Sequence, residues 1–248
     1  MAVNPWTLLD TASVPGGEGD LRLMQRGSEF SIMAGTTSLM NSRMSGSEEA
    51  LASLSWQAIA GRARPHMLIG GLGMGFTLRA ALDILPADAR ITVAELVPAV
   101  VEWARGPMAD VFGTCLSDPR VTIRLGDVGT ALVGENLYDA VLLDVDNGPE
   151  GLTRDSNQQL YSVKSLRRTL TSLRPDGVLA VWSSHTSAPF TKRLTMAGFA
   201  VREEKVRARG KKGGERHHIW LARKADPLLP KQVRYQAALY SVRSRDTG

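Results

Sequence analysis

The chain has little of several features that define whole classes of protein. It carries one cysteine, Cys115, which excludes an intrachain disulfide and which we interpret as an ordinary thiol, and its four histidines lack metal-site spacing. No apolar run approaches the roughly 18 residues of a membrane-spanning helix, and the N-terminal residues lack the pattern of a signal peptide. We therefore expect a cytoplasmic protein with no metal and no membrane contact.

The composition and the order of predicted strands and helices indicate one main domain with a small appendage. The 248 residues are 43% hydrophobic and 22% charged, enough for one sizeable core. Short alternating runs in the first part indicate a small β element, and Ser47 to Ala60 reads as an amphipathic helix capped by Ser47. Strands and helices then alternate, as in a parallel sheet covered on both faces. We predict three parts: 1–60, the N-terminal β element with its linking helix; 61–224, an α/β domain; and 225–248, a basic tail.

The most informative motif is a cluster of glycines that follows an apolar run. Gly71, Gly73 and Gly75 come directly after Met67 to Gly70 and directly before a helical pattern. Such a strand-to-helix turn lets the backbone approach a ligand, although glycines can also serve a purely structural turn. A dinucleotide fingerprint would need a glycine where Phe76 stands, and the ending of a Walker loop is missing. The turn therefore favours a nucleoside without phosphates.

Carboxylates follow the neighbouring predicted strands. Glu95 lies about twenty residues beyond the glycines, where an acidic residue would hold ribose hydroxyls. Asp127 follows the run Val121 to Leu125, and Asp144 and Asp146 follow the run Tyr138 to Leu143. One such aspartate alone is more often a helix cap or a turn former. Their succession favours a ligand site at the carboxyl edge of a sheet.

Over roughly residues 35 to 223 the chain resembles the spermidine synthase family, within the class I methyltransferase fold that binds S-adenosylmethionine. The matching segments are Ile69–Arg79, Ala94–Leu96, Pro98–Val101, Gly126–Asp127, Tyr138–Asp144, Leu160–Ser162 and Leu173–Ala180. The resemblance implies a Rossmann-like α/β fold with a seven-stranded sheet. It also implies that Glu95 binds ribose, that Asp127 binds the adenine amino group, and that Asp144 stands where the family's catalytic aspartate deprotonates an amine.

The chain departs from this family around the expected acceptor site. Met74 stands where aminopropyl-transferring members carry an aspartate that holds the cofactor's amine, and the loop from Asp144 to Pro149 is shorter. Of an acidic upstream stretch only Glu49 is expected to persist as a substrate contact. We therefore expect methyl transfer from S-adenosylmethionine to a nitrogen or oxygen nucleophile, with Asp144 or Asp146 as the base. Aminopropyl transfer from decarboxylated S-adenosylmethionine is the alternative, and a non-catalytic ligand-binding relative is the second.

The densest charge cluster lies in a predicted hairpin loop, Arg207 to Arg216. It is either a solvated loop or an anion-binding flap that acts through Arg209, Lys211 and Lys212. The net charge of +5 is compatible with nucleic acid, but no aromatic residues interleave with these basic ones. We therefore expect a small or peptide-like anionic substrate. The tail after residue 224 is a candidate basic helix that covers the domain or a second subunit, which leaves a homodimer open.

Overall fold

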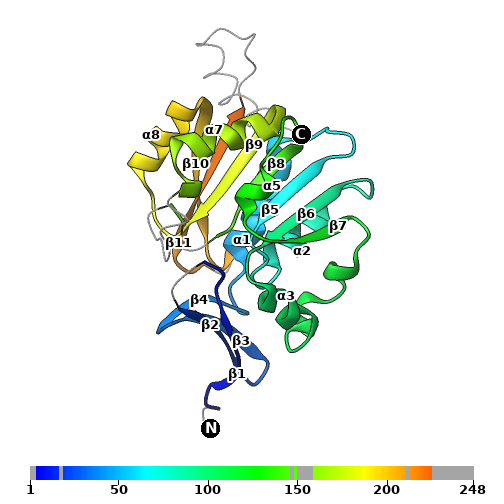
Figure 1. Ribbon diagram of the computed structural model, residues 1–248, viewed down its shortest axis with the longest axis vertical. Helices are drawn as coiled ribbons and strands as arrows, with labels where there is room; N and C mark the ends of the chain where they lie inside the picture. Colours follow the sequence, from blue (N-terminus) through cyan, green and yellow to red (C-terminus); the bar gives the residue numbers. More distant parts are fainter. Residues whose placement is uncertain (1–3, 17–18, 146–147, 150–158, 211–212, 225–248) are drawn as a thin grey trace.

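The computed structural model describes residues 4–16, 19–145, 148–149, 159–210 and 213–224. These residues contain two β-sheets (Figure 1). The smaller sheet is antiparallel, with its four strands in chain order, and it lies beneath the larger one in Figure 1. Its strands are β1 (Thr7–Ser13), β2 (Asp20–Arg26), β3 (Glu29–Ala34) and β4 (Thr37–Asn41). The small N-terminal β element is thus confirmed.

The larger sheet has seven strands in the order β10-β11-β9-β8-β5-β6-β7. All are parallel except β11, which is antiparallel to both of its neighbours. Its strands are β5 (His66–Gly70), β6 (Arg90–Glu95), β7 (Val121–Leu125), β8 (Tyr138–Leu143), β9 (Leu173–Ser183), β10 (Phe199–Arg207) and β11 (Arg216–Lys224). This confirms the predicted α/β fold of the class I methyltransferase type.

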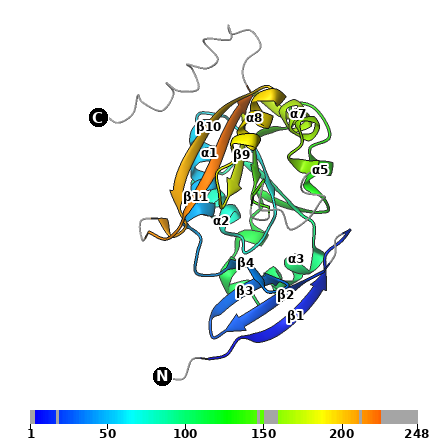
Figure 2. The ribbon, with the colours of Figure 1, turned by 90° about the vertical axis from the view of Figure 1, so that its left-hand side faces the viewer.

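Helices cover both faces of the larger sheet. Successive residues of a strand point to opposite faces. Accordingly, Met67 and Ile69 pack in a core with α1, α2 and α3, whereas Leu68 packs in a second core with α5, α7 and α8 (Figure 2). The helices are α1 (Gly46–Ala58), α2 (Phe76–Ile84), α3 (Pro98–Arg105), α4 (Ala109–Phe112), α5 (Val128–Ala131), α7 (Val163–Ser172) and α8 (Ala188–Ala197).

The small sheet contacts the rest of the protein through its apolar face and through a hydrogen bond with α3. Leu23 and Ile32 are buried in the same core as α1 to α3. The indole N–H of Trp103 in α3 donates a hydrogen bond of 2.6 Å to Asp10 in β1. The carboxyl ends of β5, β6 and β8 therefore face a second layer instead of open solvent. Ligands of open α/β sheets bind at this edge, where the strand order reverses between β8 and β5.

The helix α1 differs from its prediction in one respect. It begins at Gly46 with Ser45 as its N-cap residue, so the expectation that Ser47 caps the helix was wrong. Ser47 is buried within the first turn, where its hydroxyl serves other partners. The helix packs on α2 and on the strand β9 of the large sheet. The predicted division at residue 60 stays a prediction. Within the described residues no helix is long and apolar enough to span a membrane.

Candidate functional site

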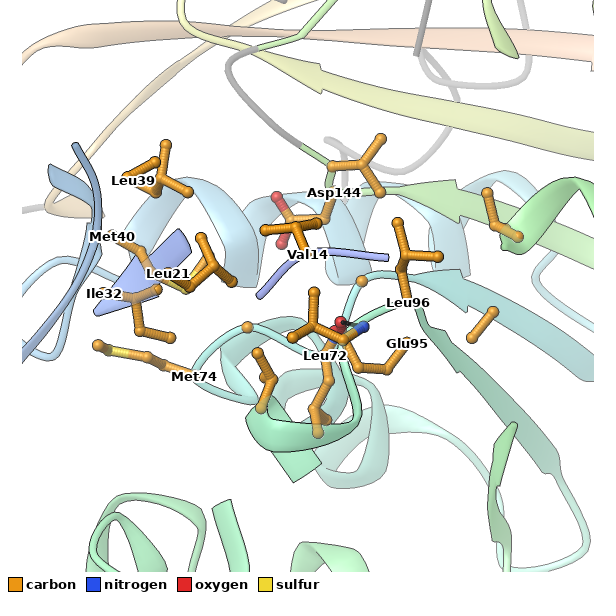
Figure 3. A pocket seen from close by; sticks show the side chains of 18 of the residues that line it. Val14, Leu21, Ile32, Leu39, Met40, Leu72, Met74, Glu95, Leu96 and Asp144 are labelled. Atoms are coloured by element: carbon orange, nitrogen blue, oxygen red, sulfur yellow. Dashed lines mark hydrogen bonds between the residues drawn. The ribbon is translucent and has the colours of Figure 1, made fainter. Parts of the chain in front are cut away.

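A cavity of about 510 Å³ lies between the small sheet and the carboxyl ends of β5, β6 and β8 (Figure 3). Its size is typical of a small-molecule site. It brings together five of the residues predicted from the sequence, Gly71, Gly73, Glu95, Asp127 and Asp144. Residues up to 73 positions apart in the chain therefore meet where the β-strands end, as the strand pattern indicates. The roles assigned to them stay predictions.

The glycine turn is shaped by close contacts that leave no room for side chains. Gly71 has a φ of +90°, and a Cβ atom there would lie 2.7 Å from the carbonyl oxygen of Asp144. Gly75, with a φ of +74°, is the N-cap residue of α2, and a Cβ atom would lie 2.5 Å from the ring of Phe112. Gly75 does not line the cavity. It shapes the turn from behind, whereas Gly71 and Gly73 present backbone to the cavity.

Glu95, the last residue of β6, holds the glycine turn against its neighbouring strand. Its two carboxylate oxygens accept hydrogen bonds of 2.8 Å from the N–H groups of Leu72 and Val97. Burial raises the pKa of Glu95, and these backbone hydrogen bonds oppose that rise. Each oxygen keeps a further lone pair. The side chain can therefore accept ribose hydroxyls while it fixes the turn.

Asp127 serves as a helix cap as well as a lining residue. Its Oδ1 accepts a hydrogen bond of 2.6 Å from the N–H of Gly129 at the start of α5. The more common role of an aspartate after a strand is thus confirmed here. Asp127 is exposed and lines the cavity. Its predicted contact with an adenine amino group stays a prediction.

Two carboxylates, Asp144 and Glu48, line the cavity, and only Asp144 was predicted from the sequence. Asp144 follows β8, and its Oδ2 accepts a hydrogen bond of 2.8 Å from the Thr77 hydroxyl. Burial raises the pKa of Asp144 to about 6. Glu48 lines the same cavity from α1, and burial together with the charge of Asp144 raises its pKa to about 7. Figure 3 shows the Asp144 carboxylate directed into the space beside Val14 and Leu21.

Glu49, the expected substrate contact, faces elsewhere. It is exposed, accepts a hydrogen bond of 2.7 Å from the Ser45 hydroxyl, and lines a separate, smaller depression. A signal for Glu48 was present in the sequence. Leu51, Ala52 and Ser55, three, four and seven positions later, form the buried face of α1, and Glu48 shares that face. Helical periodicity therefore places Glu48 toward the interior.

Hydrogen bonds continue from Glu48 toward the last strand of the sheet. The Ser47 hydroxyl donates to Oε2 of Glu48 over 2.6 Å and lies 2.9 Å from Nδ1 of His217. Burial lowers the pKa of His217, so its imidazole is neutral near pH 7. The same imidazole packs edge-on against Trp182, which lines the cavity and whose indole N–H has no partner among the described residues. A bound ligand could satisfy that donor.

The described part of the basic hairpin loop does not line the cavity. It lies at the carboxyl edge of the sheet, where the Gly46 N–H donates a hydrogen bond of 3.0 Å to the carbonyl oxygen of Ala208. Arg209 is exposed and does not line the cavity. No lysine, arginine or histidine is among the described lining residues, so an anionic substrate does not fit the charges of this cavity. Asp146, Lys211 and Lys212, together with the tail 225–248, lie outside the described residues.

Sequence comparison relates part of the chain to curated enzymes. No family model matches it. It is 33% identical over 136 residues to the polyamine aminopropyltransferase of Corynebacterium efficiens, covering 53% of this chain and 25% of that one. It is 32% identical over 160 residues to the one of Mycobacterium tuberculosis H37Rv, covering 60% and 29%. The one of Nitrosomonas europaea is 32% identical over 143 residues, covering 55% and 39%. The chain thus spans about a quarter to two fifths of the length of these relatives.

Solved structures share the fold over nearly the whole chain. The spermidine synthase of Thermotoga maritima superposes with a TM-score of 0.65 at 16% identity, covering 92% of this chain and 77% of that one. A probable spermidine synthase of Corynebacterium glutamicum gives a TM-score of 0.59 at 16% identity, covering 94% and 87%. The chain thus resembles the spermidine synthase family in part of its sequence and in its fold. The resemblance drawn from the glycine turn and the carboxylates is therefore confirmed.

The comparisons correct the expected reaction. Methyl transfer was the leading expectation, and it was wrong, because the curated relatives bear the name of the alternative, aminopropyl transfer. The expectation gave weight to Met74 and to the basic loop as signs that an acidic acceptor pocket was lost. The structure shows acidic groups at the cavity all the same, since Glu48 lies beside Asp144.

Proposed function

We propose that the chain transfers the aminopropyl group of decarboxylated S-adenosylmethionine to the nitrogen of a primary amine. The observation that carries the proposal is the pair of carboxylates, Glu48 and Asp144, in a cavity whose described lining holds no cationic side chain. Such a cavity favours ligands that are cations, as amines and sulfonium compounds are. The names of the curated relatives support the same activity.

The residues at the cavity suit a nucleoside donor. Glu95 would accept the ribose hydroxyls, Asp127 would accept from the adenine amino group, and Gly71 would bring backbone close to the ligand. The donor supplies a propyl carbon activated by a neighbouring sulfonium. The acceptor nitrogen forms its new bond to that carbon, the carbon–sulfur bond breaks with its electron pair passing to sulfur, and methylthioadenosine leaves.

Asp144 and Glu48 would prepare the acceptor for this attack. A primary amine is protonated at neutral pH and has no free lone pair until a base takes the proton. A carboxylate whose pKa is raised to about 6 is a stronger base than an ordinary aspartate while still ionised at pH 7. The hydrogen bonds from Glu48 through Ser47 to His217 would carry the released proton away from the cavity.

Turnover with decarboxylated S-adenosylmethionine and a panel of primary amines tests the proposal. Methylthioadenosine, measured by chromatography, should form only when both substrates are present. Asp144→Asn should lower kcat by ~10²- to 10⁴-fold, the range for a lost general base, with donor affinity nearly unchanged. Glu49→Gln is the matched control, because Glu49 lies outside the cavity. Absence of methylthioadenosine with every amine would refute the proposal.

A further inference from the structure

One end of the cavity is walled by aliphatic side chains. Leu21, Ile32, Leu39 and Met40 come from the small sheet, and Met74 comes from the glycine turn. Figure 3 shows Ile32, Leu39, Met40 and Met74 grouped on one side of the cavity, beside the space into which Asp144 points. Ile32 and Met74 are each only 2% exposed, so this wall is a continuation of the core.

A charged group has no partner at this apolar wall. An ammonium placed there would lose its hydration without an ion pair or a hydrogen bond in return, which is costly. A methylene or methyl group placed there would instead leave water for an apolar surface. Each buried methylene raises affinity by about fourfold. The wall therefore selects for an apolar body.

Within the described residues, the carboxylates at the cavity have few positions left for a further cation. Glu95 accepts two backbone hydrogen bonds, and Asp127 caps α5. Asp20 is exposed at the rim and accepts a hydrogen bond from the Ser13 hydroxyl over 2.9 Å. Glu48 and Asp144 remain for the reacting amine and for the ammonium of the transferred aminopropyl group. A diamine would bring a third positive group to these two carboxylates.

We infer that the acceptor is a primary monoamine with an apolar body, an alkylamine or aralkylamine, whose nitrogen lies at Asp144 and whose body packs on Leu39, Met40 and Met74. This inference rests on the proposed aminopropyl transfer and narrows its substrate class. Side chains of the small sheet would then determine which acceptor binds. The reacting nitrogen would stay at the carboxylates of the large domain.

Hexylamine and cadaverine, which match in length and differ in one terminal group, test the inference. With decarboxylated S-adenosylmethionine as donor, kcat/KM for methylthioadenosine formation should be at least about tenfold higher for hexylamine. It should also rise by about fourfold for each methylene from butylamine to hexylamine. Equal or better turnover of cadaverine overturns the inference and leaves the proposed transfer intact. No methylthioadenosine with hexylamine, but turnover of another amine of the panel, likewise overturns the inference alone. Absence of methylthioadenosine with every amine overturns the proposed transfer, and the inference with it.

A substitution in the wall gives the reciprocal test. Leu39→Glu places a carboxylate among the apolar side chains, so it should lower turnover of hexylamine and raise that of cadaverine. Leu39 is only half-buried, and Met40→Glu at the next position repeats the test should the first variant fold poorly. Leu8→Glu introduces the same charge on an exposed part of the small sheet, away from the cavity, and should leave the ratio unchanged. An unchanged ratio in folded Leu39→Glu and Met40→Glu proteins would count against the inference.

Discussion

Glu48→Gln should stabilise the folded protein, and the gain should depend on pH. Glu48 has a pKa of about 7 in the fold, against an ordinary value of 4.5, because it is buried and faces the charge of Asp144. A raised carboxyl pKa means that the folded state binds the proton more tightly than the unfolded state does. Stability is therefore lost as the pH rises from about 4.5 to about 7. Fully developed, this loss is about 3 kcal/mol, an upper limit because the side chain is partly accessible.

The free energy of unfolding, measured in urea at pH 5 and pH 8, tests this reasoning. Glu48→Gln removes the ionisable group, so the variant should be more stable than the wild type at pH 8 by up to about 3 kcal/mol and nearly equal at pH 5. Glu49→Gln is the control, since the neighbouring side chain is exposed and should change little at either pH. A Glu48→Gln protein that shows the same stability difference at both pH values would refute the raised pKa of Glu48.

Three further outcomes follow from the site. Glu95→Ala should weaken donor binding by ~1.5 to 3 kcal/mol in calorimetry, the scale of lost hydrogen bonds to a charged group, and unchanged affinity in a folded variant would remove the ribose assignment. Gly71→Ala should lower the free energy of unfolding by about 1 to 3 kcal/mol, because its φ is +90° and the new methyl group meets the Asp144 carbonyl; a neutral effect would contradict this geometry. Wild-type kcat/KM should fall as the pH drops through about 6, where Asp144 takes up a proton, and a flat profile there would exclude Asp144 as the base.

The fold was predictable because its parallel strands appear in the sequence as short apolar or alternating runs between helical patterns. The runs Val121 to Leu125 and Tyr138 to Leu143 are the strands β7 and β8 without a shift at either end. Their apolar content and the alternation with helices decide the fold class before any tertiary contact is known. The glycine turn and Glu95 were likewise predictable, since both lie where a strand ends and their spacing follows from one βαβ unit.

The acceptor end of the site was harder to predict, because it is made by tertiary contact. Leu21, Leu39 and Met40 reach the cavity only through the docking of the small sheet, and nothing in their local sequence distinguishes them from core residues. The choice of Glu49 over Glu48 followed from an alignment by motif, although the periodicity of α1 favours Glu48. The position of Arg209 was hard to predict for a related reason. The strand order places its loop at the carboxyl edge of the sheet, where the cavity lies, but Arg209 does not line the cavity.

The identity of the nucleoside product tests most directly whether the chain transfers an aminopropyl group. The purified chain would be incubated with S-adenosylmethionine and decarboxylated S-adenosylmethionine together and a mixture of primary amines, and the products would be separated by mass spectrometry. We expect methylthioadenosine together with an amine enlarged by one aminopropyl group, and we expect both products to be lost in Asp144→Asn. S-adenosylhomocysteine with a methylated acceptor, or no product from either donor, would contradict it.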